Sequence, residues 1–238
     1  MNLRWLGELL PQVVDVFMIH FALSHQLVED CLKQLSSDEV QRAMRLRRTV
    51  ERNQWIISRA IIRQVLGLYL NCPPEEVGFQ VGEHGKPKVA GLEFNTSHSG
   101  STVAIAVSKT APVGIDIEFS DRDVNFEQVA RLLFSADERT VWQALSQLQR
   151  RPVFFETWVA KEAALKARGV GLNQSLPKIS VVKCELAGQF IVLDPTFEGK
   201  MAGMTFSNSN PALCGAVVLL NGKAIELRVC EQTVTTLN

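Results

Sequence analysis

The feature that most constrains the fold of this chain is an order of elements that its sequence predicts twice. In the first occurrence, residues 13–23 form an apolar run typical of a buried strand, and residues 36–70 follow a helical pattern, in one bent helix or two. Ser36 and Glu39 begin that pattern as a capping box, and Cys72-Pro73-Pro74 ends it, because proline cannot continue a helix. Residues 77–107 are then β-rich and include Val103–Val107 as a short buried strand.

The second occurrence begins after Pro112. It consists of a strand at Gly114–Glu118, helical patterns at residues 126–149 and, after Pro152, at residues 153–168, and a β-rich remainder. Gly169 and Gly171 supply the helix stop. We therefore expect an α+β protein whose two lobes meet near residues 108–113. The predicted strands of the remainder are Ile179–Lys183, Gln189–Leu193, Met204–Phe206, Cys214–Leu220 and Ile225–Val229.

The charge balance and the cysteines argue against several classes of function. The 238 residues carry 25 Lys and Arg against 25 Asp and Glu, and since nonspecific nucleic-acid binding favours a basic chain, no nucleic-acid partner is expected. No run reaches the ~18 apolar residues of a membrane span, and the N-terminal stretch lacks the apolar core of a signal peptide. With five scattered cysteines and no C-x-x-C pair, we expect a cytoplasmic protein with reduced thiols and no membrane partner.

Two carboxylates share one face of the predicted strand Gly114–Glu118. Because the side chains of a strand alternate, Asp116 and Glu118 point one way, and Ile115 and Ile117 point the other. A hard cation such as Mg²⁺ binds carboxylate and phosphate oxygens, so the pair is a candidate metal site. An edge strand with a solvated acidic face explains the same pattern.

The predicted helix 153–168 carries a second group of charges. Glu162 and Lys166 are spaced i, i+4 and share a helix face, while Lys161 lies on an adjacent stripe with Trp158. Glu162 is a candidate third metal ligand or general base, and Lys161 and Lys166 are candidate phosphate contacts. A surface helix with one salt bridge and an aromatic anchor also explains these residues.

Three further segments carry side chains suited to phosphate. Gly85-Lys86-Pro87 is a turn that presents a lysine, and the polar segment Asn95–Gly100 contains Ser97 and His98 as hydrogen-bond donors. This Ser/His pair does not indicate a nucleophile, because adjacent residues of an extended chain point apart and no G-x-S-x-G elbow is present. The third segment is a basic helix face. It would suit a phosphorylated ligand or an acidic protein partner, or it would simply be a solvated surface. Its residues are Arg45, Arg48, Arg52, Arg59 and Arg63.

Together these motifs resemble the 4′-phosphopantetheinyl transferases of the Sfp type. The family patterns G-x-D-x-E, F-S-x-x-E and W-x-x-K-E-x-x-x-K match Gly114–Glu118, Phe134–Glu138 and Trp158–Lys166. The upstream elements G-K-P and N-x-S-H-S-G match Gly85–Pro87 and Asn95–Gly100. Each motif is weak alone, but five in the same order are specific. The resemblance spans residues 36–172, and no motif transfers to the chain after residue 173.

The resemblance implies a role for each matched residue. Asp116, Glu118 and Glu162 would hold Mg²⁺, and Asp116, Glu162 and Lys166 would be the catalytic residues. The role of Glu138 stays open. The side chains that would contact the phosphates and nucleotide of coenzyme A are Lys86, Ser97, His98, Lys161 and Lys166, with Arg42, Arg45, Arg52 and Arg59 as candidates for its 3′-phosphate.

The resemblance also implies a fold and a reaction. The fold is a monomer of two similar lobes related by a pseudo-twofold axis, with residues 1–110 on the nucleotide side of coenzyme A and residues 111–238 carrying the metal-binding and catalytic motifs. A serine of an acyl or peptidyl carrier protein would attack the β-phosphate of coenzyme A, 3′,5′-ADP would leave, and Mg²⁺ would neutralise charge. Glu162 would take the serine proton directly or through a metal-bound water. A non-catalytic module that binds coenzyme A or a carrier, and a Mg²⁺-dependent phosphohydrolase, are the alternatives.

Overall fold

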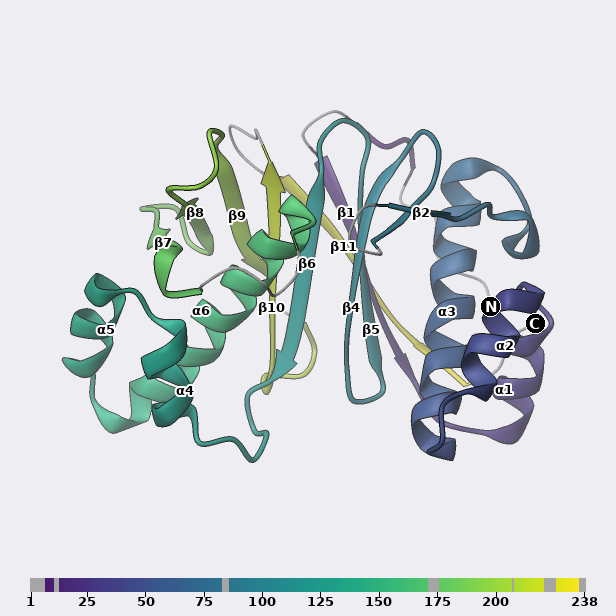
Figure 1. Ribbon diagram of the computed structural model, residues 1–238, viewed down its shortest axis with the longest axis horizontal. Coiled ribbons are helices and arrows are strands. Elements are labelled where there is room, and N and C mark those ends of the chain that lie inside the picture. Colours follow the sequence, from purple (N-terminus) through teal and green to yellow (C-terminus); the bar gives the residue numbers. More distant parts are fainter. Residues whose placement is uncertain are drawn as a thin grey trace.

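Two β-sheets packed face to face form the middle of the molecule, and helices cover both outer faces (Figure 1). The structure is a computed structural model that describes residues 7–10, 13–82, 86–170, 176–206, 208–220 and 226–235. The first sheet has the strand order β11-β1-β5-β4, and the second has the order β6-β10-β9-β8-β7. The predicted α+β class is confirmed.

The first sheet lies under three helices. Its strands are β1 (Val13–Phe21), β4 (Glu93–Ser99), β5 (Thr102–Ser108) and β11 (Glu226–Val234), and the helices are α1 (His25–Leu32), α2 (Ser37–Met44) and α3 (Thr49–Leu70). Phe17 and Ile19 of β1 face the helices, whereas Val16 and Met18 face the second sheet. Because both faces are covered, β1 is buried and is apolar apart from Asp15 and His20, as predicted from the sequence.

The second sheet is antiparallel and is crossed by one long helix. Its strands are β6 (Val113–Phe119), β7 (Ser180–Lys183), β8 (Gln189–Leu193), β9 (Met201–Phe206) and β10 (Leu213–Leu220). The long helix is α6 (Gln147–Arg168), and α4 (Phe126–Leu133) and α5 (Ala136–Gln143) pack against it through an aromatic cluster around Phe134 and Phe154. Shorter elements are β2 (Gln80–Val81), β3 (Pro87–Lys88) and the 3₁₀ turns Pro74–Glu76 and Leu176–Lys178.

The helices agree only in part with the predictions. The pattern at residues 36–70 is two helices, α2 and α3, which is one of the two arrangements that the sequence left open, and α1 has no counterpart among the predicted elements. The single helix predicted at residues 126–149 is wrong, because Phe134 and Ser135 are extended and Ser135 starts α5 with its own capping box. Pro152 does not interrupt α6, since it lies in the second turn and removes only the bond to the carbonyl of the exposed Leu148.

The two lobes share one plan, in which a long helix lies on an antiparallel pair of strands. The division predicted at residue 110 stays a prediction, and the structure adds that β11 pairs in parallel with β1, so the end of the chain joins the first sheet. Gly169 ends α6 in the left-handed conformation, as predicted, while Gly85, Gly171 and Ile225 lie outside the described residues. No helix in the described ranges is long and apolar enough to cross a membrane.

Candidate active site

The two sheets meet along β4 and β6, which are joined by side chains of β4 in place of a backbone ladder. Asn95 Oδ1 accepts the N–H of Ile115 at 3.1 Å, Ser97 Oγ accepts that of Ile117 at 3.3 Å, and Ser99 Oγ accepts that of Phe119 at 3.3 Å. Alternate residues of β4 therefore bind alternate residues of β6. This arrangement turns the polar segment Asn95–Gly100 into the seam between the lobes.

The same two hydroxyls also hold the carboxylates of β6. Ser97 Oγ donates to Asp116 Oδ1 at 2.8 Å, and Ser99 Oγ donates to Glu118 Oε2 at 2.6 Å. The predicted alternation of β6 is present, because Ile115 and Ile117 are buried between the sheets while both carboxylates lie on the other face.

Gly114 lets α6 lie close to that carboxylate face. A Cβ at this position would stand 2.0 Å from the carbonyl oxygen of Ala163 and 2.4 Å from the nitrogen of Ala167, so only glycine fits here. Glu162 and Lys166 precede these two alanines by one residue each and share a helix face. The close contact of strand and helix thus brings Glu162 and Lys166 to Asp116 and Glu118.

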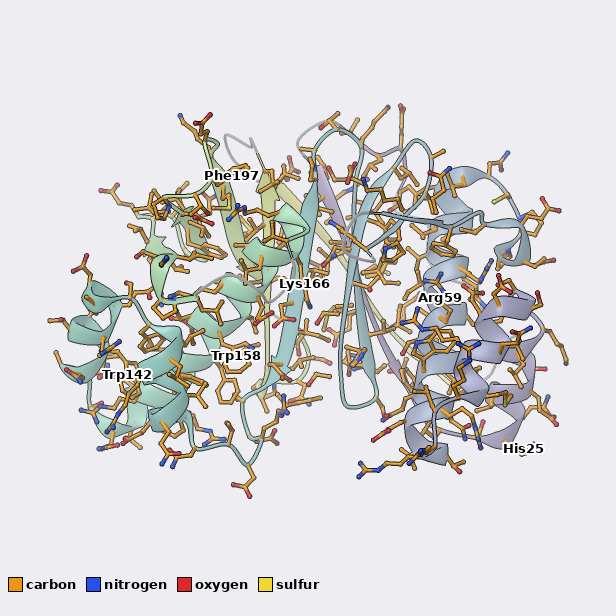
Figure 2. All side chains as sticks on the ribbon, viewed as in Figure 1. His25, Arg59, Trp142, Trp158, Lys166 and Phe197 are labelled. Carbon is orange, nitrogen blue, oxygen red and sulfur yellow. The ribbon has the colours of Figure 1, made fainter. Side chains whose placement is uncertain are left out.

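Lys166 is the main counter-charge of Asp116. Its Nζ donates to Asp116 Oδ1 at 2.6 Å, to Ser97 Oγ at 3.1 Å and to the carbonyl of Ile115 at 3.2 Å. Burial raises the pKa of Asp116, and Lys166 and Ser97 partly offset that effect. Figure 2 shows Lys166 near the middle of the molecule, beside β6.

Glu162 is the carboxyl without a counter-charge of its own. No hydrogen bond or ion pair joins it to the described residues, although its side chain is half-buried. Burial raises its pKa to about 7, and the nearby charge of Asp116 adds to the rise while Lys166 opposes it. A carboxyl that is partly ionised near neutral pH is suited to accept a proton.

The donor set fits a hard divalent cation. Asp116, Glu118 and Glu162 supply only oxygen ligands, and the charges of Asp116 and Glu118 add to the rise in the pKa of Glu162 that burial causes. Among the described residues, no group of three or more acidic, histidine or cysteine side chains is arranged to hold a metal ion as it stands. Oε1 of Glu118 is instead paired with Arg122, on the loop that follows β6.

Lys161 does not join this group. Its side chain has no exposure to solvent, and its Nζ donates to Glu138 Oε2 at 2.6 Å and to the carbonyls of Leu133 and Leu176 at 2.7 and 3.1 Å. An ammonium has three donors, and all three are engaged here. The predicted contact of Lys161 with phosphate does not fit this environment.

Glu138 acquires a structural role that the sequence left open. Its Oε2 accepts the N–H of Ser135 at 2.8 Å, which completes the capping box of α5, and its Oε1 accepts the N–H of Val181 at 2.8 Å. With Lys161, it ties α5, α6 and the edge strand β7 together.

Lys86 lies between the lobes, but its bonds are to backbone. Its Nζ donates to the carbonyls of Lys166 at 3.0 Å and Val113 at 3.3 Å, at the C-terminal end of α6 and the start of β6. Burial lowers the pKa of Lys86. A cavity of about 280 Å³ adjoins it, with walls from both lobes that include Lys88, Phe94 and Arg168.

The remaining predicted phosphate contacts are either fully bonded within the site, as Ser97 is, or lie away from the carboxylates. Ser97 has used its one donor and both acceptor positions, which leaves no donor for the predicted phosphate contact. His98 is exposed and, by alternation along β4, faces away from Ser97. Arg45 is exposed at the end of α2, and Arg52 is half-buried on α3. Arg59, seen on the helical layer beyond the first sheet in Figure 2, is paired with Glu39.

Comparison with known proteins assigns the chain to a family. A model of the 4′-phosphopantetheinyl transferase superfamily matches residues 112–203, and one of the 4′-phosphopantetheinyl transferase N-terminal region matches residues 20–110. The 4′-phosphopantetheinyl transferase HetI of Nostoc sp. is 34% identical over 170 residues, which are 69% of this chain and 72% of that protein. This chain belongs to the 4′-phosphopantetheinyl transferase family. The resemblance inferred from the motifs is thereby confirmed.

Other 4′-phosphopantetheinyl transferases match over different lengths. The psf-1 protein of Bacillus pumilus is 30% identical over an alignment that covers 82% of this chain and 84% of that protein. AcpT of Salmonella typhimurium is 34% identical and covers 58% of this chain and 73% of its own length. A crystal structure of a holo-(acyl-carrier-protein) synthase from Bacillus anthracis in complex with CoA (3′,5′-ADP) covers 46% of this chain and 95% of its own, at 22% identity and a TM-score of 0.40, which is too remote to inform the site.

The roles of four residues near this site were not predicted from the sequence, although three of them lie in recognised motifs. Asn95 and Ser99 bind partners about twenty positions away in the sequence, and Arg122 binds one four positions away. Nothing in their own segments indicates those partners. Gly114 was part of a recognised motif, but the close approach of α6 that requires it is visible only in three dimensions.

Proposed function

We propose that this protein transfers the 4′-phosphopantetheine group from coenzyme A to a serine of an apo carrier protein, acyl or peptidyl, and releases 3′,5′-ADP. The observation that carries the proposal is the convergence of Asp116 and Glu118 of β6 with Glu162 and Lys166 of α6, in a chain of this family. Three carboxylates beside one lysine suit a reaction on a metal-bound pyrophosphate better than a reaction on a neutral substrate.

Glu162 accepts the proton of the attacking serine. Its carboxyl makes no hydrogen bond or ion pair with the described residues, and its pKa is about 7 in the metal-free protein, so that a bound cation would add to the fraction ionised at neutral pH. The serine oxygen forms a bond to the β-phosphorus of coenzyme A, the bond from that phosphorus to the bridging oxygen breaks, and 3′,5′-ADP leaves with the bonding electrons. The serine proton passes to Glu162.

Lys166 is the proposed phosphate contact, and Asp116 orients its ammonium group. All three donors of the Lys166 ammonium are engaged, by Asp116, Ser97 and the carbonyl of Ile115, but 29% of its side chain is exposed, unlike that of Lys161, so it can exchange one of these bonds for an incoming phosphate oxygen. Fixed positive charge at the position where negative charge develops lowers the barrier without reorganisation.

Asp116, Glu118 and Glu162 are the residues that would hold Mg²⁺. The ion would neutralise charge on the pyrophosphate and orient it. Ligation by Glu118 requires that Arg122 give up Oε1 of this carboxylate, which is feasible because Arg122 is exposed.

Coenzyme A would extend from these residues toward the first lobe. The interlobe cavity beside Lys86 is too small for the whole molecule and is a candidate for one part of it. His98, Arg45 and Arg52 stay proposed contacts for its phosphates and nucleotide. A monomeric state, a cytoplasmic location and lobes divided at residue 110 belong to the same proposal, and size-exclusion chromatography with light scattering tests the first of them.

The test is a set of apo carrier proteins from different pathways, each incubated with this protein, coenzyme A and Mg²⁺. The intact mass of each carrier is measured, and 3′,5′-ADP is quantified by chromatography. We expect a carrier to gain one phosphopantetheine group in step with release of 3′,5′-ADP, and we expect a chelator to stop both.

Each alternative gives a different result in the same assay. Release of 3′,5′-ADP without any carrier would indicate a phosphohydrolase. Binding of coenzyme A that a chelator does not affect, without product on any carrier, would indicate a non-catalytic binding module. Either result would contradict the proposed transfer.

A further inference from the structure

We propose that Ser99 is a positioning residue that holds Glu118 for the divalent cation, an inference that rests on the proposed function. Ser99 is the last residue of β4 and is 7% exposed. Its hydroxyl donates to Oε2 of Glu118 at 2.6 Å and accepts the N–H of Phe119 at 3.3 Å. One hydroxyl therefore fixes both the carboxylate and the strand that carries it.

Two side chains bind Glu118: Arg122 through an ion pair and Ser99 through a hydrogen bond. Arg122 pairs with Oε1, and its side chain is 58% exposed on a loop. A guanidinium and a metal cation compete for the same negative charge, so a bound cation displaces Arg122. Ser99 is neutral and binds the other oxygen, so its hydrogen bond remains when a cation takes Oε1.

The orientation of Glu118 therefore depends on Ser99 whenever Arg122 is displaced. Without the hydroxyl, Glu118 would be free to rotate or to stay with Arg122. Hydrogen bonds to a ligating carboxylate contribute roughly 10–100-fold to metal affinity in known sites.

The seam between the lobes supplies a matched control. Asn95 accepts the N–H of Ile115 at 3.1 Å, just as Ser99 accepts that of Phe119, but Asn95 contacts neither Asp116 nor Glu118. Replacement of Asn95 by alanine removes one bond between β4 and β6, whereas replacement of Ser99 by alanine removes such a bond and a carboxylate donor. The difference between the two variants therefore isolates the effect of losing the hydrogen bond to Glu118.

The experiment measures binding of Mn²⁺, as a probe for Mg²⁺, to the protein saturated with coenzyme A. Water-proton relaxation reports free and bound Mn²⁺ without any turnover. We expect Ser99→Ala to weaken Mn²⁺ binding by about 10-fold or more, in line with other hydrogen-bonded metal ligands. We expect Asn95→Ala to change it by less than about twofold, since Asn95 contacts neither Asp116 nor Glu118. Melting temperatures of both variants show how much each lost bond affects the fold.

A second pair of variants keeps the test independent of stability. Thr and Val have nearly the same shape and differ by the hydroxyl, so Ser99→Thr should bind Mn²⁺ more tightly than Ser99→Val by the same factor of about 10. Equal affinities of Thr and Val variants, or an Asn95→Ala effect as large as that of Ser99→Ala, would overturn the inference.

Failure of this inference is distinguishable from failure of the proposed function. If wild-type protein modifies a carrier but Ser99→Ala binds Mn²⁺ like wild type, the function stands and Ser99 is only a bond between the lobes. If wild-type protein binds no Mn²⁺ at all, the metal assignment is wrong and the role of Ser99 is wrong with it. If no carrier is modified, the function is wrong, while the Mn²⁺ comparison still reports on Ser99.

Discussion

Lys161 and Glu138, which belong to two different sequence motifs, form an ion pair with each other at 2.6 Å and take no part in the carboxylate site. The ammonium is fully buried and is completed by two backbone carbonyls. One lysine of the motif Trp158–Lys166 thus stabilises the second lobe, and the other, Lys166, lies at the site.

The two lysines should respond differently to the same substitution. Lys161→Met leaves Glu138, whose side chain is only 12% exposed, without its cation; loss of one partner of a buried pair typically costs about 3–5 kcal/mol, so we expect a large loss of stability in urea unfolding. Lys166→Met leaves Asp116 without its main counter-charge and should also lower stability, but unlike Lys161→Met it should in addition lower the rate of transfer per folded molecule. A Lys161→Met variant as stable as wild type would contradict the structural role.

Gly114→Ala should destabilise the protein by about 2 kcal/mol or more, since the added Cβ would overlap the backbone of α6 and overpacking typically costs 1–3 kcal/mol. The variant should also lose transfer activity, because α6 carries Glu162 and Lys166. Gly78→Ala is the matched control, as a Cβ there meets nothing within 4 Å. Equal stability of these two variants in thermal unfolding would show that β6 and α6 are not in such close contact.

Glu162 makes the metal-free protein less stable as the pH rises. Its pKa is about 7 in the folded state against 4.5 for the unfolded group, so the folded state binds the proton more tightly. This loss of stability begins as the pH rises past about 4.5 and is complete above pH 7. We therefore expect metal-free Glu162→Gln to be more stable than wild type at pH 8, by roughly 1 kcal/mol after allowance for partial exposure, and not at pH 4.

The measurement is thermal unfolding in the presence of a chelator at both pH values. An equal difference between Glu162→Gln and wild type at pH 4 and pH 8 would show that ionisation of Glu162 is not the cause. Addition of Mg²⁺ at pH 8 should stabilise wild type more than the variant, because the ion binds the folded state through this carboxylate.

The sequence predicted the elements whose signals are local. The alternation of Asp116 and Glu118 with Ile115 and Ile117, and the capping box at Ser36, depend only on neighbours along the chain. The break at Ser135 had the same kind of signal, because Ser135 and Glu138 repeat the capping pattern inside a segment that was interpreted as one helix.

The partners of the site residues could not be predicted in the same way. The i, i+4 spacing in α6 shows that Glu162 and Lys166 share a face, but not that Lys161 enters a pocket made by Leu133, Glu138 and Leu176. Ser97 was expected to contact phosphate because it lies in a segment of hydrogen-bonding side chains that matches a family motif. Its orientation toward β6 depends on the packing of two sheets, which no local pattern encodes.

The most direct test of the account is transfer of phosphopantetheine to an apo carrier by wild type and by Asp116→Asn, in the presence of Mg²⁺. Asparagine keeps the shape of Asp116 and an oxygen for Lys166 and Ser97, but removes the charge that the site would use for the cation. We expect the intact mass of the carrier to show transfer by wild type and a rate at least about 100-fold lower for the variant, with a similar melting temperature. Asp121→Asn, at an exposed carboxylate on the loop after β6, should behave like wild type. Near-normal transfer by Asp116→Asn would contradict the assignment of the site.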